Sequence, residues 1–397
     1  MKTFDERLAV VKKHIEADDI KVMIIGLGSV GSFLLDYLIS KNDPSIKVIV
    51  VGRNLEKMQS KVNITRVAGL IRGVNKSSVT IESGVDLESV DAIAAAISKY
   101  QPDFIVNSSR AYSGLKYGSI SWANLRAYGL WSPLSIKYTK NIMEACDKAY
   151  TSAITINTSY SDAVIPWLKS AGKAYPDFGS GNLNHLVPRI KFAVASILEV
   201  SDFWNVDVMF AAAHFHDVCI SKEGQNEGVE LPLKVYYKGV EQDIPQDKIF
   251  SLCRIAMPVD QTRNMMNASS NYQIITAVID AVRTGVPQKV FTPGFDGNIG
   301  GYPVRIAVDA GVLTARIDES VFDFATMNAA NRKSLALDGI EDVVDGTLIY
   351  TDELVDKVAR VFGKSLPKKV AYSDIENVAG FIITEIINPY LEAKSKE

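Results

Sequence analysis

The sequence predicts an α/β fold: a doubly wound parallel sheet in residues 1–165, followed by an α+β domain with a mostly antiparallel sheet in residues 166–397. Three observations lead to this prediction. Apolar runs alternate with amphipathic segments of helical period as far as about residue 165, which is typical of strands joined by crossover helices. A glycine-rich turn, Gly26-Leu27-Gly28-Ser29-Val30-Gly31, joins the first run to the first such segment. Beyond residue 165 the regular alternation stops, and strand-like runs follow one another.

The glycine-rich turn is the most informative stretch. It follows the apolar run Ile20 to Ile25 and opens a segment with an apolar stripe at Val30, Phe33, Leu34, Tyr37 and Leu38. Gly26 permits a tight turn, Gly28 lets the backbone approach a pyrophosphate, and Gly31 lets helix and strand pack closely. Free N–H groups at the helix start, around Ser29 and Val30, suit phosphate oxygens. The turn therefore predicts a Rossmann domain that binds a dinucleotide.

The other elements of the first domain follow from the same periodicities. We expect helices over residues 4–17, 55–71, 89–100 and 134–149, and strands over 46–51, 79–81, 104–107 and 153–157. Residues 111–133 carry glycine and proline breaks and several aromatic side chains. Because long connections of this kind are usually functional, we expect an irregular lid or substrate loop there.

The end of the second strand indicates which cofactor is bound. An acidic residue at this point would bond the 2′-hydroxyl of NAD. The sequence instead has Arg53, with Asn54 beside it and Lys57 one turn on. A guanidinium pairs well with a phosphate, so we predict NADP, with NAD as the weaker alternative. The alternative interpretation of Arg53 is a solvated residue at a helix start.

Further cofactor contacts are expected where other strands end. Ser108, Ser109 and Arg110 follow the fourth strand, at the edge where open α/β sheets bind ligands. Asp86 either caps the next helix or lies close to the adenine ring. Asn157 and Thr158, at the end of the fifth strand, are expected beside the nicotinamide half.

The second domain holds three of the four histidines. His214-Phe215-His216-Asp217 follows the apolar run Val208 to Ala213, and on a strand both imidazoles would share one face. Two imidazoles on one face suit a metal or an acid–base pair, and Asp217 or Asp162 could fix a tautomer. The alternative is that both rings pack within a sheet. His185, near a helix start, is a rival catalytic candidate, and helix capping by Asn182 or Asn184 is its structural alternative.

Two further features shape the second domain. Residues 293–303 are rich in glycine and form either structural turns or a wall of the substrate site. The last helix, Ile375 to Ala393, is expected to pack back on the first domain or on another subunit.

Composition excludes several classes of partner. The net charge is −3 and no apolar run approaches the length of a membrane span, so neither nucleic acid nor a membrane is expected. Three widely spaced cysteines indicate reduced thiols, with neither a disulfide framework nor a metal site. We expect a cytoplasmic homodimer that binds a small-molecule substrate.

The first 110 residues resemble the NADP-binding half of the saccharopine dehydrogenase and carboxynorspermidine dehydrogenase group. The resemblance rests on the glycine-rich turn, on Gly52-Arg53-Asn54-Leu55-Glu56-Lys57, on Val85-Asp86-Leu87 and on residues 100–107. It implies a Rossmann domain with a mixed α+β substrate domain, and reductive joining of an amino group to a carbonyl or the reverse oxidation.

Past residue 110 the similarity is fainter. Asn157-Thr158-Ser159, Gly181-Asn182-Leu183-Asn184-His185 and Gly297-Asn298-Ile299 resemble opine dehydrogenases and the NAD- and manganese-dependent glycosidases. Those glycosidases use a cysteine and a histidine as metal ligands, and no cysteine stands near residues 157 or 185.

Three hypotheses follow. The first is an NADP-dependent dehydrogenase or reductase of saccharopine or opine type, acting on an amino-acid-like substrate. The second is a glycosidase- or lyase-like enzyme that uses tightly bound NAD(P) as a redox catalyst. The third is a non-catalytic protein that senses NADP(H).

Overall fold

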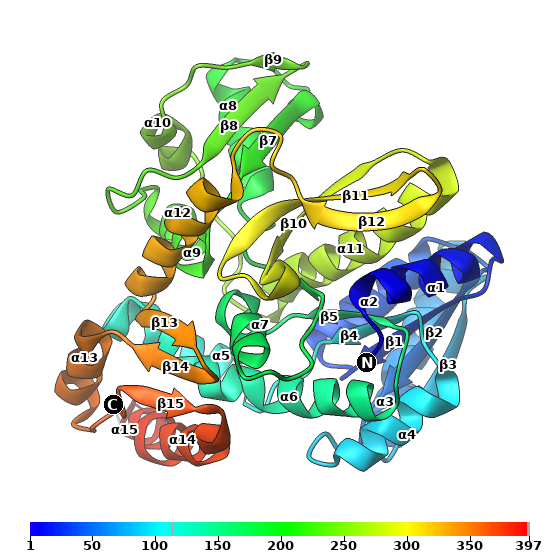
Figure 1. The fold of residues 1–397 in the computed structure, drawn as a ribbon, viewed down its shortest axis with the longest axis horizontal. Coiled ribbons are helices and arrows are strands. Elements are labelled where there is room, and N and C mark those ends of the chain that lie inside the picture. The colour runs from blue at the N-terminus through cyan, green and yellow to red at the C-terminus, as the bar shows by residue number, and fades with distance from the viewer. Residues whose placement is uncertain (113, 395–397) are drawn as a thin grey trace.

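The computed structural model describes residues 1–112 and 114–394 (Figure 1). Its first part is a six-stranded parallel sheet in the order β3-β2-β1-β4-β5-β6. The strands are β1 (Ile20–Ile25), β2 (Ile46–Val51), β3 (Ser78–Glu82), β4 (Phe104–Asn107), β5 (Ile154–Asn157) and β6 (Phe178–Gly179). This order is that of the doubly wound dinucleotide-binding fold, so the predicted fold class is confirmed.

Each face of the parallel sheet packs into a different core. In β1, Val22 and Ile24 pack against α1 and α2, whereas Met23 and Ile25 pack on the side of α4 and α6. Both faces are therefore apolar, as a sheet covered on two sides requires. The helices of this part are α1 (Phe4–Glu16), α2 (Ser29–Ser40), α3 (Leu55–Ile71), α4 (Val90–Tyr100), α6 (Ser132–Lys148) and α7 (Ser161–Ser170).

The second part holds three separate antiparallel sheets of three strands each (Figure 1). They are β7 (Val206–Phe210), β8 (Leu233–Tyr237) and β9 (Val240–Glu241); β10 (Gln288–Pro293), β11 (Gly301–Asp309) and β12 (Val312–Ile317); and β13 (Ile340–Val344), β14 (Thr347–Tyr350) and β15 (Lys369–Ala371). The helices are α8 (Val187–Ile197), α9 (His214–Glu223), α10 (Gln246–Ser251), α11 (Asn264–Thr284), α12 (Phe324–Leu337), α13 (Asp352–Phe362), α14 (Ile375–Phe381) and α15 (Asn388–Lys394).

The second part contacts both faces of the first. Helix α11 packs along α2, and β10 to β12 share the core of α1 and α2. On the other face α14 packs against α6. The last helical segment is not one regular helix, because a π-helical stretch, Ile382–Ile387, separates α14 from α15.

Two local predictions are wrong. Residues 111–133 are not irregular: they contain α5 (Gly114–Ile120), a π-helix (Ser121–Leu125) and a 3₁₀ turn (Gly129–Trp131), whereas residue 113 lies outside the described residues. The strand before the histidines ends at Phe210, and His214 is the first residue of α9. Tertiary contacts determine the structure of both segments.

The parallel sheet also extends past the expected boundary at residue 165. Residue 165 lies inside α7, and β6 pairs with β5 beyond it. The division of the chain into two domains stays a prediction. None of the helices in the described part of the chain has the length and apolar character that crossing a bilayer requires.

Candidate active site

A cavity of about 1070 Å³ lies at the carboxyl edge of the parallel sheet. The glycine-rich turn, the end of β2 and the end of β4 all contribute to it, through Gly26, Gly28, Ser29, Val30, Arg53, Asn54, Ser108, Ser109 and Arg110. We call it the nucleotide cavity. Most of the predicted cofactor residues thus meet in one place, although they come from three separate turns.

The three glycines have distinct geometric roles. Gly26 has a φ of +89°, which side chains disfavour. A Cβ on Gly31 would lie 2.2 Å from the carbonyl oxygen of Gly26, so this glycine is what lets α2 approach β1. A Cβ on Gly28 would meet nothing within 4 Å, which leaves its backbone open to a ligand. Gly28 is also the N-cap of α2 and provides no side-chain cap, so helix N–H groups remain for phosphate oxygens.

Basic side chains gather at the β2 end of the nucleotide cavity. Arg53, Lys57 and Lys61 line it together with one acid, Glu56. Among the described residues, none of these three cations forms an ion pair with a carboxylate. Asn54 caps α3 by accepting a hydrogen bond from the Lys57 amide at 2.8 Å. This cap fixes the helix start that carries the basic cluster.

Two smaller cavities, of about 480 and 180 Å³, adjoin the nucleotide cavity. Gly114 lines all three, and Asn264 lines both the nucleotide cavity and the larger of the two. His185, His214, Asn182 and Tyr128 line both smaller cavities. We treat the two together as the inner cavity.

His214 is held by a carboxylate from a distant part of the chain. Its Nδ1 lies 2.8 Å from Oδ2 of Asp338, the buried residue that ends α12. The Tyr160 hydroxyl donates to the same oxygen at 2.7 Å, and the Tyr128 amide donates to Oδ1 at 2.7 Å. Because Nδ1 is engaged, Nε2 is the nitrogen left for a substrate in the inner cavity.

The charge environment of His214 favours the protonated ring. Burial alone would lower its pKa, but the charge and hydrogen bond of Asp338 outweigh burial, and the pKa is raised above 6.5. Asp162 lies next to it and accepts the His214 amide at 3.0 Å. Burial raises the pKa of this carboxyl to about 6, although the His214 charge and the Asn182 amide favour its ionised form.

His185 forms a second histidine–carboxylate pair in the same cavity. Its Nδ1 lies 3.6 Å from Oδ2 of Asp217. Its Nε2 is buried and has no hydrogen-bond partner in the described structure. A buried polar atom without a partner costs free energy, so this nitrogen is suited to a ligand.

Cations outnumber acids in the lining of the larger of the two cavities that form the inner cavity. Arg189, Lys222 and Arg263 line it, and no carboxylate of the described residues lies within ion-pair distance of any of them. Arg189 is buried, and its Nε has no hydrogen-bond partner. Burial lowers the pKa of both Arg189 and Lys222, as expected for charges withdrawn from water. This arrangement suits a negatively charged group of a substrate.

His216 does not share a face with His214. On a helix, residues two apart point in different directions, and His216 is fully buried with Nε2 3.1 Å from the Asn226 carbonyl oxygen. Burial lowers its pKa to about 4, so the ring is neutral near pH 7. The predicted pairing of the two imidazoles on one strand face is wrong. Asp217 faces the inner cavity and belongs with His185.

Two predicted cofactor residues lie elsewhere. Asp86 does not cap α4, because Ser89 does so by accepting from the Ala92 amide, and the Asp86 carboxylate accepts from the Glu88 amide. Asp86 also does not line the nucleotide cavity, whereas its neighbours Val85 and Leu87 do. Asn157 is fully buried and bonds Asn107 and Ser161, so its amide organises the sheet edge. Thr158, next to it, does reach the inner cavity.

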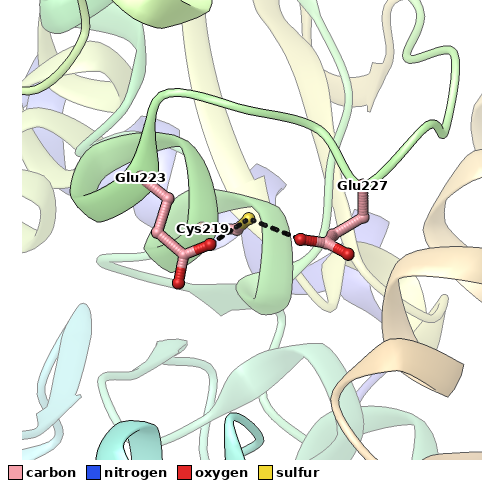
Figure 2. Close-up of side chains that lie close together, drawn as sticks. All are labelled: Cys219, Glu223 and Glu227. Atoms are coloured by element: carbon pink, nitrogen blue, oxygen red, sulfur yellow. Dashed lines mark hydrogen bonds between the residues drawn. The ribbon is translucent and has the colours of Figure 1, made fainter.

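One group of possible metal ligands occurs among the described residues, namely Cys219, Glu223 and Glu227, whose ligand atoms lie within 4.8 Å of one another (Figure 2). The Arg126 guanidinium forms ion pairs with both carboxylates, and the Trp122 indole donates to Glu223 at 2.9 Å. Burial raises the pKa of the Cys219 thiol to about 12. One guanidinium therefore already pairs with both carboxylates, and the cluster joins the residue 121–126 segment to α9.

Sequence reasoning did not find Asp338, Arg263 or Asn264. No motif surrounds them, and they lie 49 or more residues from His214 in the numbering. Tyr160 carries only a weak signal, as an aromatic residue shortly after β5, and Tyr128 is one of several aromatic residues in the 111–133 segment. The sequence before Gly339 does not indicate that a helix ends there in a buried aspartate. Only the fold shows this.

Comparison with known proteins agrees with the first half of the architecture. Residues 22–122 match the saccharopine dehydrogenase NADP binding domain. The glycine-rich turn, Arg53 and the serines after β4 all fall within this match. The chain thus contains an NAD(P)-binding domain of a kind that dehydrogenases carry. No curated protein matched the chain by sequence.

Solved structures show the same fold over most of the chain. Malate dehydrogenase from Salinibacter ruber matches with a TM-score of 0.52 at 15% identity, covering 87% of this chain and 100% of that one. Malate dehydrogenase from Cryptosporidium parvum gives 0.52 at 13% identity, with 81% and 98% covered. Lactate dehydrogenase from the same organism gives 0.52 at 14%, with 81% and 97% covered. At these identities the likeness concerns the fold.

Proposed function

We propose that the protein is an NADP-dependent oxidoreductase. It moves hydride between the cofactor and an imine or carbonyl carbon of an anionic, amino-acid-like substrate. The observation that carries the proposal is the His214–Asp338 pair, whose imidazole lines a cavity that adjoins the nucleotide cavity. An acid–base group next to a dinucleotide site is what such chemistry needs.

Each residue of the site has a separate role in the reaction. Reduction of C=O or C=N adds hydride to carbon and a proton to oxygen or nitrogen. When bound, the nicotinamide supplies or accepts the hydride. Protonated His214 donates the proton from Nε2, and the neutral ring accepts it in the oxidative direction. Asp338 orients the ring and stabilises its charged form, and Tyr160 and the Tyr128 amide hold Asp338.

The basic cluster supports NADP over NAD. Arg53, Lys57 and Lys61 present three cations at the β2 end of the nucleotide cavity. A 2′-phosphate placed there would gain charge-assisted hydrogen bonds, whereas a ribose hydroxyl would leave the cations unpaired. We therefore expect Arg53→Asp to weaken NADPH binding by at least about tenfold and NADH binding far less, measured by fluorescence titration. Equal losses for both nucleotides would contradict the assignment.

The cations of the inner cavity support an anionic substrate. Arg189, Lys222 and Arg263 outnumber Asp217 and Asp260, the carboxylates that line the same cavity. A carboxylate is the group that an amino-acid-like substrate would bring to them. It would also give the unpartnered Arg189 Nε and His185 Nε2 an acceptor or a bridging contact.

The proposal is tested by following NADPH absorbance at 340 nm with panels of 2-oxo acids, alone and with amino acids or polyamines. We expect NADPH consumption by acids and little by their esters, because an ester has no charge for the cations. Turnover of a substrate without any net change at 340 nm would favour the redox-catalyst alternative. Nucleotide binding without turnover of any substrate would favour the sensing protein.

A further inference from the structure

Three asparagines form a row along one face of α11. Asn264, Asn267 and Asn271 are spaced by three and four residues, which places them above one another on a helix. The Asn267 amide donates to Oδ1 of Asn264 at 3.3 Å, and the Asn271 amide donates to the Asn267 carbonyl oxygen at 3.1 Å. We call these residues the amide row. Amides at three successive facing positions are unusual for a helix that otherwise packs an apolar face.

The amide row joins the two parts of the chain where the cavities meet. The Asn264 amide donates to the hydroxyl of Ser29, the first residue of α2, at 2.6 Å. At the other end, the Asn271 amide donates to Thr158 at 3.1 Å, at the end of β5. Asn264 lines the nucleotide cavity and the inner cavity, and Asn267 lines the inner cavity with Thr158 and His214. The row therefore runs from the glycine-rich turn to Thr158, and Asn267 lines the same cavity as His214.

Helix α11 is firmly placed in this position. It packs along α2, and the Tyr37 and Tyr272 rings meet edge to face with centroids 6.1 Å apart. Arg283 at its far end forms ion pairs with Asp43 and Asp18. A helix anchored along its length can hold amides for a ligand without ordering a loop.

We propose that the amide row is the second wall of the cofactor site and binds the nicotinamide-side ribose of the dinucleotide. The inference rests on the proposed function. A ribose diol needs donors and acceptors together, and a carboxamide side chain has both. Asn264 uses one N–H on Ser29, and no described residue donates to Oδ1 of Asn267. Both side chains therefore keep polar atoms that can form hydrogen bonds with ribose hydroxyls. The ribose would lie between the pyrophosphate and His214.

The position of the row limits the part of the ligand it can reach. Arg53 and its neighbouring cations lie at the end of β2, away from β5 and Thr158. The adenosine half of the dinucleotide is expected at the end of β2. At one end the row contacts Ser29, at the helix start that is expected to receive the pyrophosphate. At its other end it contacts Thr158, at the strand end beside the inner cavity. It should therefore affect the intact dinucleotide and leave a ligand without the nicotinamide half unaffected.

The test compares two ligands on four proteins. NADPH and adenosine 2′,5′-bisphosphate, which lacks the nicotinamide half, are titrated by calorimetry into wild type, Asn264→Ala, Asn267→Ala and Gln273→Ala. Gln273 is an exposed residue of the same helix outside the cavities and serves as the matched control. Both asparagine variants should bind NADPH at least about tenfold more weakly and the bisphosphate within about twofold of wild type. Gln273→Ala should match wild type for both ligands.

Other outcomes are decisive. Unchanged NADPH affinity in both asparagine variants overturns the inference. Equal losses for both ligands also overturn it, because Asn264 would then act only by holding Ser29. Asn264→Asp, which keeps the size of the side chain, guards against a folding defect and should weaken NADPH more than Asn264→Ala because its charge faces the pyrophosphate. A wild-type protein that binds neither ligand would instead contradict the proposed function.

Discussion

At the scale of single residues, His214 is the centre of the account. Its ring lies among Asp338, Asp162, Tyr128 and Tyr160, with the two tyrosine rings edge-on at 4.7 and 5.1 Å between centroids. Tyr160 has a φ of +44°, and a non-glycine residue held in that region costs about 1–2 kcal/mol. The surrounding structure therefore holds Tyr160 in a strained conformation, and that conformation places its hydroxyl on Asp338.

The Asp338 carboxylate should set the pH dependence of turnover. His214 has a raised pKa because Asp338 outweighs the effect of burial, so Asp338→Asn should lower that pKa. Reduction needs the protonated ring, and its rate falls as pH rises through the His214 pKa. The falling limb of the kcat profile should therefore move to lower pH.

Tyr160→Phe is the control for this shift. It removes one hydrogen bond from Asp338 and leaves its charge, so the limb should move much less. A profile for Asp338→Asn that coincides with wild type would contradict the role of the carboxylate.

Substitution of His214 should mainly affect turnover, whereas substitution of His216 should mainly affect stability. His214→Asn should reduce kcat at least about a hundredfold, because it removes the acid–base group, with little change in cofactor affinity. His216→Asn should leave kcat near wild type and cost about 1–3 kcal/mol of unfolding free energy, because the fully buried imidazole loses its packing and its hydrogen bond to the Asn226 carbonyl oxygen. Steady-state kinetics and urea unfolding measure the two effects, and a large loss of kcat in His216→Asn would contradict this division.

At the scale of elements, the sequence was most informative where local pattern and tertiary structure agree. The strand–turn–helix from Ile20 to Ser40 has an apolar strand, three glycines and a helical stripe that all favour the same structure. The start of α9 lacks any such signal. Its N-cap is Ala213, which offers no side-chain bond, and the His214 amide is instead satisfied by the Asp162 carboxylate from α7. Because a distant residue supplies this cap, the local sequence has no pattern that predicts the helix start.

Residues 114–131 differ from the expected irregular loop for a similar reason. Their glycines indicate a loop, yet Trp122 and Arg126 bind Glu223 and hold the segment against α9. Arg126 also has a φ of +52°, a conformation that its ion pairs help to retain. Long-range contacts therefore impose helical structure that the local sequence does not favour.

The two central glycines should respond differently to a methyl group. Gly31→Ala forces a Cβ within 2.2 Å of a backbone oxygen, so α2 must shift and the unfolding free energy should fall by about 1–3 kcal/mol. Gly28→Ala meets no atom within 4 Å and should keep wild-type stability while weakening NADPH binding, because the methyl group occupies the path of the pyrophosphate. Denaturant unfolding and nucleotide titration check both, and a destabilised Gly28→Ala would contradict the distinction.

At the scale of the whole molecule, the inner cavity is assembled from distant segments. His214 begins α9, Asp338 ends α12, Thr158 follows β5 and Asn264 begins α11. The nucleotide cavity could be predicted from sequence because the turns after β1, β2 and β4 line much of it, and each of these turns follows an apolar strand that the sequence indicates. The inner cavity could not, because each contributor is a single polar residue whose neighbours in the sequence have no shared pattern.

We propose that one dinucleotide spans both cavities with its nicotinamide beside His214. A crystal structure with NADP⁺ bound tests this proposal. We expect the 2′-phosphate on Arg53, the pyrophosphate at Gly28 and Ser29, and nicotinamide C4 in the inner cavity next to His214 and Thr158. A bound NADP⁺ whose nicotinamide lies outside the inner cavity, or whose 2′-phosphate is remote from Arg53, would contradict it.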